Sequence, residues 1–192
     1  MTSYSAADLD AALEALSDSS LAATEFEIAR AVVIAATLTG HTIAAGESLT
    51  AGLVCATLAS VPGASTVLRG GVVAYATDLK TGGLGVDAAV IARSGVISTP
   101  VAEAMAEGVR VWAGADIGLG CTGVAGPDEQ DGHPVGEVHL AVAGPGPAVR
   151  THTLTLGGDR DGIRHGTVLM LLGMVLDVLL PHVHHRNDGA GE

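Results

Sequence analysis

The sequence predicts an α/β protein of three layers, α/β/α, in which helices cover both faces of a mixed, mostly parallel sheet ending in an antiparallel hairpin and a C-terminal helix. Three observations lead to this class. Short apolar runs alternate with stretches of helical periodicity along most of the chain. Two strand-like runs, 136–143 and 149–156, flank a Gly-Pro-Gly-Pro segment typical of a hairpin. A long apolar segment, 168–180, has the character of a buried closing helix.

The elements follow from local patterns taken in order. Strands are expected at 42–45, 69–76 and 116–122, besides the two strands of the hairpin. Helices are expected at 9–16, 26–38, 50–59, 87–92, 99–113 and from 159 to just before Pro181. Thr24 and Glu25 are candidate capping residues for the second helix, and Ser98 for the fifth. We therefore expect a helical arm at 1–24, one domain at 25–181 and a disordered polar tail at 182–192.

Length and composition restrict the function. A chain of 192 residues fits a single domain, and 9 Lys plus Arg against 21 Asp plus Glu give a net charge of -12, which opposes nucleic-acid binding. Cys55 and Cys121 show no disulfide or zinc spacing and are expected to be buried apolar residues. The N-terminus lacks the regions of a secretory signal, and the segment 168–180 is shorter than the ~20 residues of a membrane span. We expect a cytoplasmic protein that binds no nucleic acid and no membrane.

Lys80 is the only lysine in the chain, because eight of the nine basic residues are arginine. An ammonium group can be driven towards neutrality by burial and then act as a base, whereas an arginine cannot be deprotonated in a protein. Lys80 follows a predicted buried strand by a few residues, where such shelter is available. The alternative is an arginine-biased composition that leaves one lysine on the surface.

Ser48 lies in the run 46–52 (GESLTAG), where a strand gives way to a helix. The free N–H groups of a helix start can stabilise an oxyanion, so a serine at this position is a candidate nucleophile. The alternative is a serine that only caps the helix, since the G-x-S-x-G pattern of a nucleophile elbow is missing.

A second small-residue loop, 121–127 (CTGVAGP), follows the strand at 116–122 and is expected at the same edge of the sheet. The overlapping run 118–123 fits G-x-G-x-x-G, but its glycines lie within the strand and no helix opens on them, so we interpret them as packing glycines. Arg160 and Arg164, one helical turn apart, could hold a phosphate or pair with nearby acids.

No metal site is predicted. The acidic loop with Asp128, Glu129 and Asp131 lacks the ligand alternation of a calcium loop and is interpreted as a solvated turn. His182, His184 and His185 have no supporting carboxylates and are assigned to the tail.

Five blocks of the sequence, in order, resemble the CinA C-terminal domain family over about residues 25 to 180. They are GESLTAG at 46–52, SVPGAS at 60–65, GGVVAYATDLKTGGLGV at 70–86, TGVAGPDEQDGHPVGEV at 122–138 and GDRDGIR at 158–164. The family is similar to amidohydrolases of the PncC type, which convert nicotinamide mononucleotide to nicotinate mononucleotide and ammonia. It also occurs behind a separate N-terminal domain in longer competence/damage-inducible proteins. The resemblance implies that this protein hydrolyses the carboxamide group of nicotinamide mononucleotide without a cofactor or a metal ion.

By position, the resemblance places the serine nucleophile at Ser48, the lysine at Lys80 and a tyrosine at Tyr75, which could otherwise serve packing in its strand. Substrate-binding residues are expected in the same blocks and at the start of the last helix. They are Leu49, Thr50, Gly52, Thr122, Gly123, Gly126, Arg160 and Arg164.

The sequence departs from the family pattern at three places. Ala51 stands where a glycine is common, Thr77 where asparagine is common, and the loop 127–134 is acidic rather than glycine-rich. These departures leave open a non-catalytic nucleotide-binding or regulatory module. A factor acting directly on DNA conflicts with the charge. The expected partners are a small nucleotide substrate and, because the chain is apolar with few aromatic residues, further copies of itself.

Overall fold

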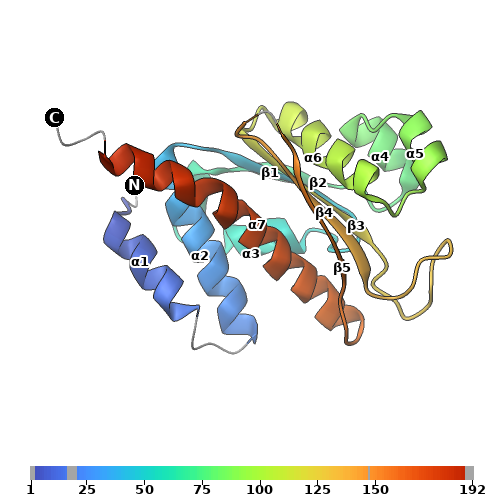
Figure 1. Cartoon of the computed structure of the whole chain (residues 1–192), viewed down its shortest axis with the longest axis horizontal. Helices are drawn as coiled ribbons and strands as arrows, with labels where there is room; N and C mark the ends of the chain where they lie inside the picture. The colour runs from blue at the N-terminus through green and yellow to red at the C-terminus, as the bar shows by residue number, and fades with distance from the viewer. Residues whose placement is uncertain (1–2, 17–20, 147, 189–192) are drawn as a thin grey trace.

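The computed structural model describes residues 3–16, 21–146 and 148–188, and it contains one five-stranded sheet of order β2-β1-β3-β4-β5 (Figure 1). The strands are β1 (Ile43–Glu47), β2 (Leu68–Val73), β3 (Ile117–Gly123), β4 (Glu137–Ala143) and β5 (Arg150–Thr155). β1 pairs in parallel with β2 and β3, whereas β4 is antiparallel to both β3 and β5. Only β4 therefore runs against the other four, which confirms the predicted mixed, mostly parallel sheet and its terminal hairpin.

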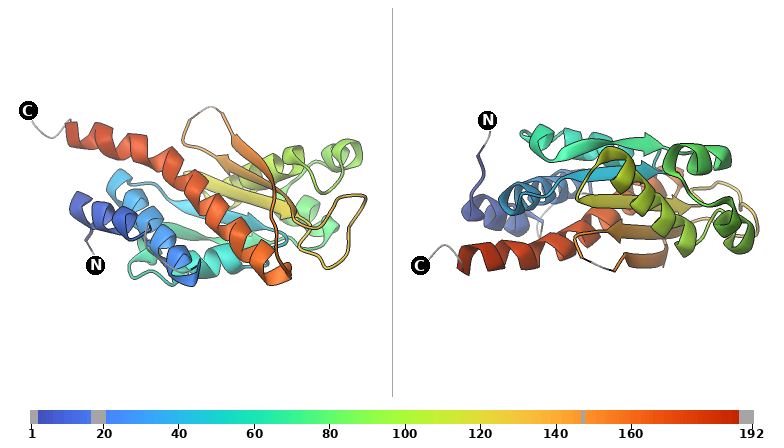
Figure 2. Two further views of the ribbon diagram at one scale, coloured as in Figure 1. Left: turned by 60° about the horizontal axis from the view of Figure 1, so that its bottom comes forward. Right: turned by 90° about the horizontal axis from the view of Figure 1, so that it is seen from above.

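Helices cover both faces of this sheet and make the predicted three layers (Figures 1 and 2). One face is covered by α2 (Leu21–Thr39), α3 (Leu53–Ala59) and α7 (Arg160–Asp188), with α1 (Ala6–Ala15) packed on α2. The other face carries α6 (Thr99–Ala113), flanked by α4 (Thr77–Leu84) and α5 (Ala88–Ser94). A short 3-10 helix, η1 (Ala64–Thr66), precedes β2.

The central strands are apolar on both faces because each face is covered by helices. In β1, Ile43 and Ala45 face the α2 and α7 layer, whereas Ala44 faces the α6 layer. β3 places Gly118 and Gly120 against α6, where an added Cβ would lie only 2.0 Å and 2.2 Å from main-chain oxygens of that helix. The glycines of the G-x-G run therefore serve close packing of a helix on a strand, as the sequence indicated.

Two helices differ from the sequence prediction near the site. α3 begins at Leu53 rather than at residue 50, because Ala51 and Gly52 have positive φ angles of 53° and 97° and cannot continue a right-handed helix. α4 was not predicted, since it is short and contains two adjacent glycines. α4 carries Lys80, so the lysine lies on a helix rather than in a loop.

The two ends of the chain also differ from expectation. α2 begins at Leu21, so Thr24 and Glu25 lie inside the helix and do not cap it. α7 does not end before Pro181 but runs to Asp188, which takes residues 182–188 out of the predicted disordered tail. A proline inside a helix loses one hydrogen bond at a cost of about 3 kcal/mol, and burial of Val183 in the core offsets part of it. Residues 189–192 and the side chains of His184 and His185 lie outside the description.

By length and composition, the segment 160–183 of α7 could cross a membrane, and half of its most apolar stretch is buried inside the fold. Its buried residues belong to the same core as α2 and the sheet. This is the pattern of a core helix.

Candidate active site

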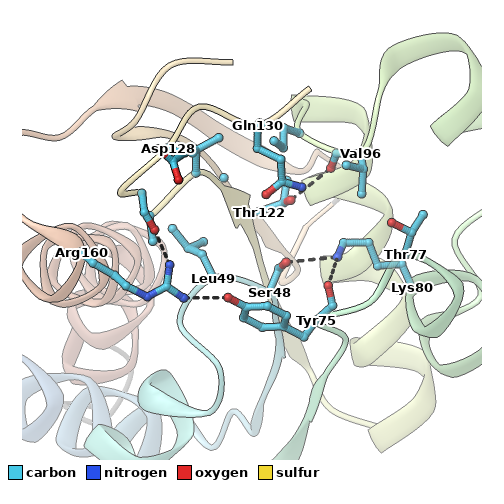
Figure 3. Close-up of a pocket in the computed structure, with 15 residues that line it drawn as sticks. Ser48, Leu49, Tyr75, Thr77, Lys80, Val96, Thr122, Asp128, Gln130 and Arg160 are labelled. Atoms are coloured by element: carbon cyan, nitrogen blue, oxygen red, sulfur yellow. Dashed lines mark hydrogen bonds between the residues drawn. The ribbon is translucent and has the colours of Figure 1, made fainter. Parts of the chain in front are cut away.

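The site lies at the edge of the sheet where the parallel strands β1, β2 and β3 end (Figure 3). Ser48 directly follows β1, Thr122 and Gly123 close β3, and Tyr75 lies two residues after β2. Ligand sites of open α/β sheets gather at this edge. The pocket there has a volume of about 120 Å³. It is lined by Ser48, Leu49, Tyr75, Thr77, Lys80, Val96, Ile97, Thr122, Gly123, Val124, Ala125, Gly126, Asp128, Gln130 and Arg160.

Lys80 reaches Ser48 from α4. Its Nζ lies 3.1 Å from Ser48 Oγ and donates hydrogen bonds to the main-chain oxygens of Ala74 at 2.7 Å and Tyr75 at 3.4 Å. The lysine is 1% exposed, and no carboxylate of the described residues forms an ion pair with it. Burial therefore lowers the pKa of Lys80, although the nearby Cys121 raises it to a lesser degree.

Tyr75 and Arg160 form one wall of the pocket. Arg160 Nη2 donates to the Tyr75 hydroxyl at 2.8 Å, and Nη1 donates to the main-chain oxygen of Gly126 at 2.5 Å. Tyr75 is about half exposed, so its ring does not fill the interior of the sheet. Both partners of the guanidinium are neutral, which leaves its positive charge available at the pocket.

The loop after β3 supplies main-chain groups to the pocket. Thr122 is buried, and its hydroxyl donates to the main-chain oxygen of Val96 at 3.1 Å, which ties β3 to the segment before α6. Leu49, Ala125 and Gly126 line the pocket, and their N–H groups donate no hydrogen bond to any residue that the structure describes. These amides are candidate donors to an oxygen anion in the pocket.

Three residues expected to bind substrate do not line the pocket. Thr50 Oγ1 and Gly52 N–H both donate to the Glu47 carboxylate, at 2.7 Å and 2.8 Å. Arg164 donates to the main-chain oxygens of Leu49 and Thr50, at 3.1 Å and 2.9 Å. The start of α3 is thus occupied by a carboxylate of the chain itself, so the expected anion site at that helix start is wrong.

Several pocket residues were not found from the sequence. Thr77 was noted only as a departure from the family, and Asp128 was interpreted as part of a solvated turn. The others are Val96, Ile97, Val124, Ala125 and Gln130. Gln130 lies only seven residues after Gly123 in an irregular loop, and no local pattern indicates which side chains of such a loop turn back over a pocket. Within the described part of the chain, no cluster of three His, Cys, Asp or Glu could hold a metal ion.

Comparisons with known sequences show the family to which the chain belongs. A sequence model of the CinA C-terminal domain matches residues 25–179. A CinA-like protein of Frankia casuarinae is 45% identical over 152 residues, which cover 78% of this chain and 35% of that protein. A putative competence-damage inducible protein of Geobacillus kaustophilus is 44% identical over 140 residues, 73% of this chain and 34% of that protein. The chain therefore spans about a third of the length of these relatives.

Solved structures share the fold over about 80% of this chain. The competence/damage inducible protein CihA from Agrobacterium tumefaciens is 33% identical, with a TM-score of 0.77 over 80% of this chain and 94% of that chain. A competence or damage-inducible protein from Enterobacter asburiae is 26% identical, with a TM-score of 0.78 over 81% and 98% of the two chains. On the sequence match and on this shared fold, the chain belongs to the CinA C-terminal domain family.

Proposed function

We propose that this protein is a Ser-Lys amidohydrolase that converts nicotinamide mononucleotide to nicotinate mononucleotide and ammonia. One observation carries the proposal: the Nζ of a fully buried lysine lies 3.1 Å from the oxygen of a serine at the edge of a pocket. A buried amine with a lowered pKa beside a hydroxyl is the arrangement that activates a serine without a histidine or a metal.

The mechanism begins with neutral Lys80. Its two N–H bonds donate to the main-chain oxygens of Ala74 and Tyr75, so the lone pair of Nζ is free to accept the Ser48 proton. Ser48 Oγ then attacks the amide carbon and forms a tetrahedral intermediate. The C–N bond breaks as the leaving nitrogen is protonated, either by the Lys80 ammonium directly or by the Tyr75 hydroxyl, which then takes the Lys80 proton. Ammonia departs, and Lys80 is neutral again. Water next attacks the acyl-enzyme and gives up a proton to Lys80. The Lys80 ammonium returns this proton to Ser48 Oγ as the acyl C–O bond breaks and the carboxylic acid leaves, which restores the neutral lysine and the serine hydroxyl.

The developing oxyanion needs donors within the pocket. We assign this role to the N–H of Leu49, next to the nucleophile, with the N–H groups of Ala125 and Gly126 as the donors across the pocket. The Thr50 amide, which the sequence had suggested beside that of Leu49, faces the sulfur of Cys121 instead.

The phosphate of the substrate is proposed to lie against Arg160, Thr122 and Gly123. An anionic protein that binds an anionic nucleotide needs a local positive charge. Because Lys80 is neutral in this mechanism, Arg160 supplies that charge among the described residues that line the pocket. Arg164 has no such role in this proposal, because it holds the turn behind Ser48 and does not line the pocket.

The test is release of ammonia by the pure protein incubated with nicotinamide mononucleotide. Ser48→Ala is expected to abolish release and leave the fold intact, as checked by circular dichroism. Ser60→Ala is the matched control, since Ser60 is exposed and its hydroxyl bonds only to the main-chain oxygen of Thr57. Undiminished turnover by Ser48→Ala would end the mechanism.

The alternative is a nucleotide-binding or regulatory module without turnover, which the departures at Ala51 and Thr77 favour. The same incubation separates the two, because binding of nicotinamide mononucleotide by calorimetry without release of ammonia supports the module. In either case we propose a small nucleotide as the ligand, self-association of the chain and a cytoplasmic location.

A further inference from the structure

We infer that Glu47 and Arg164 are positioning residues that hold the Ser48 turn, residues 48–52, from two sides. The inference rests on the proposed function, in which Ser48 is the nucleophile. Glu47 is the last residue of β1 and directly precedes this turn, whereas Arg164 reaches it from the first turns of α7. The two side chains form no ion pair with each other within the described chain, so each acts on the turn separately.

Glu47 binds the end of the turn and the start of α3. Its Oε2 accepts hydrogen bonds from Thr50 Oγ1 at 2.7 Å, Gly52 N–H at 2.8 Å and Val54 N–H at 3.1 Å, and its Oε1 accepts from Cys55 N–H at 2.9 Å. The residue is 1% exposed. Besides these four donors, the Cys55 side chain also hydrogen-bonds to the Glu47 carboxyl group, so the two oxygens are surrounded by donors, as suits a carboxylate at the start of a helix.

Arg164 binds the first part of the same turn. Its Nε donates to the main-chain oxygen of Leu49 at 3.1 Å and its Nη2 to that of Thr50 at 2.9 Å. Two parallel bonds from a planar guanidinium fix direction as well as distance. A weaker contact of 3.5 Å to Asp161 on its own helix orients the side chain.

The turn needs such support because its backbone is strained. Ala51 has a φ of 53°, a left-handed conformation that an alanine rarely adopts, and Gly52 follows with a φ of 97°. A strained segment persists only where its surroundings fix it in place. Without Glu47 or Arg164 the turn would relax, and the Ser48 oxygen would leave its place beside Lys80 Nζ.

The consequence for catalysis is a loss of rate rather than of binding. A displacement of about 1 Å at a nucleophile can lower turnover about 100-fold. Glu47→Gln puts an amide NH₂ among N–H donors, and Arg164→Lys removes the two-point contact. We expect kcat to fall about 10-fold to 100-fold in each variant, with KM changed less than about twofold and the pH dependence of the rate retained.

The experiment combines kinetics with hydrogen exchange of the free protein. Glu27→Gln and Arg30→Lys are the matched controls, because this partly buried ion pair on α2 does not line the pocket. Faster exchange confined to residues 48–55 together with the fall in kcat supports the inference. Exchange and kcat equal to the wild type in either folded variant overturn it, as does a raised KM at unchanged kcat in Arg164→Lys, which would make Arg164 a substrate-binding residue.

Failure of the proposed function is separable from failure of this inference. If the wild type releases no ammonia, the amidohydrolase proposal falls, and exchange at 48–55 alone decides whether Glu47 and Arg164 hold the turn. If Glu47→Gln does not fold, kcat and hydrogen exchange are compared with the wild type in the milder variant Arg164→Lys.

Discussion

Lys80 is the residue on which the proposed chemistry depends, and a count of lysines made it a candidate before the family resemblance assigned it a role. The structure places its Nζ in the interior, hydrogen-bonded to two main-chain oxygens and to Ser48. Burial without a neighbouring carboxylate disfavours the charged amine and so lowers the pKa of Lys80, as a general base requires. The rate constant kcat/KM should therefore rise with pH through a pKa below the usual lysine value, as measured in a pH-rate profile.

Lys80→Met tests the same burial through stability. Below the lowered pKa, the lysine is charged in both states and the folded protein carries the full cost of the buried charge. Between that pKa and about 10.5, the unfolded chain binds more protons, so a rise in pH stabilises the wild type relative to the variant. As the pH rises through this range, the excess of the unfolding free energy of Lys80→Met over that of the wild type should shrink by up to ~1.4 kcal/mol per pH unit. Parallel curves in urea titrations across pH would contradict the assignment.

Ala51→Gly should raise stability at the Ser48 turn. A left-handed alanine costs about 1–2 kcal/mol and the added freedom of glycine in the unfolded chain costs less, so we expect a net gain of about 0.5–1 kcal/mol and a few degrees in Tm. Ala56→Gly, on an exposed position of the right-handed helix α3, is the matched control and should lose about 1 kcal/mol. A loss of stability in both variants would rule out strain at Ala51.

At the scale of elements, the contact between β3 and α6 decides how the layers fit. Gly120 leaves room for the main chain of α6, because a Cβ added at this position would lie 2.2 Å from the main-chain oxygen of Ala102. The parallel register of β1 and β3, in which Glu47 pairs with Cys121, places the end of β3, and with it Thr122 and Gly123, level with Ser48. The same glycines mimic a dinucleotide motif, and only the neighbouring elements distinguish the two cases.

Gly120→Ala should destabilise the fold by about 3 kcal/mol or more, because the clash involves main chain that cannot rotate away. Gly82→Ala on α4 is the control, since nothing lies within 4 Å of the added Cβ and alanine favours a helix by about 1 kcal/mol. Chemical unfolding of both variants measures the difference. Equal stabilities would show that α6 can move away from β3.

At the scale of the whole molecule, charge and apolar surface set the partners. The net charge of -12 opposes binding to a polyanion, and no DNA complex is expected in a gel-shift assay even at low salt. A shallow groove between α4, α5 and α6 exposes Val111 and Trp112, which are 66% and 58% exposed. This groove is the apolar surface most suited to the self-association that we propose.

Trp112 is the only tryptophan, so its fluorescence reports directly on that groove. If copies associate there, the emission should shift to shorter wavelength as concentration rises, and sedimentation should show an oligomer. Trp112→Glu should weaken association at least about tenfold, whereas Met170→Glu, at an exposed position on α7, should not. A monomer in both the wild type and the Met170 variant would exclude self-association.

The sequence by itself determined the fold class, the hairpin and the order of the elements apart from α4 and η1, because periodicity and turn residues are local properties of the chain. The residues alone left Ser48 and Lys80 as candidates, and the resemblance to a known family predicted them as a pair. Tertiary structure decided what the strand ends and helix ends bind. Glu47 fills the start of α3, Arg164 holds the turn instead of a phosphate, and α7 continues through Pro181 because Val183 packs in the core. These outcomes depend on contacts between segments up to 115 residues apart, which no local pattern encodes.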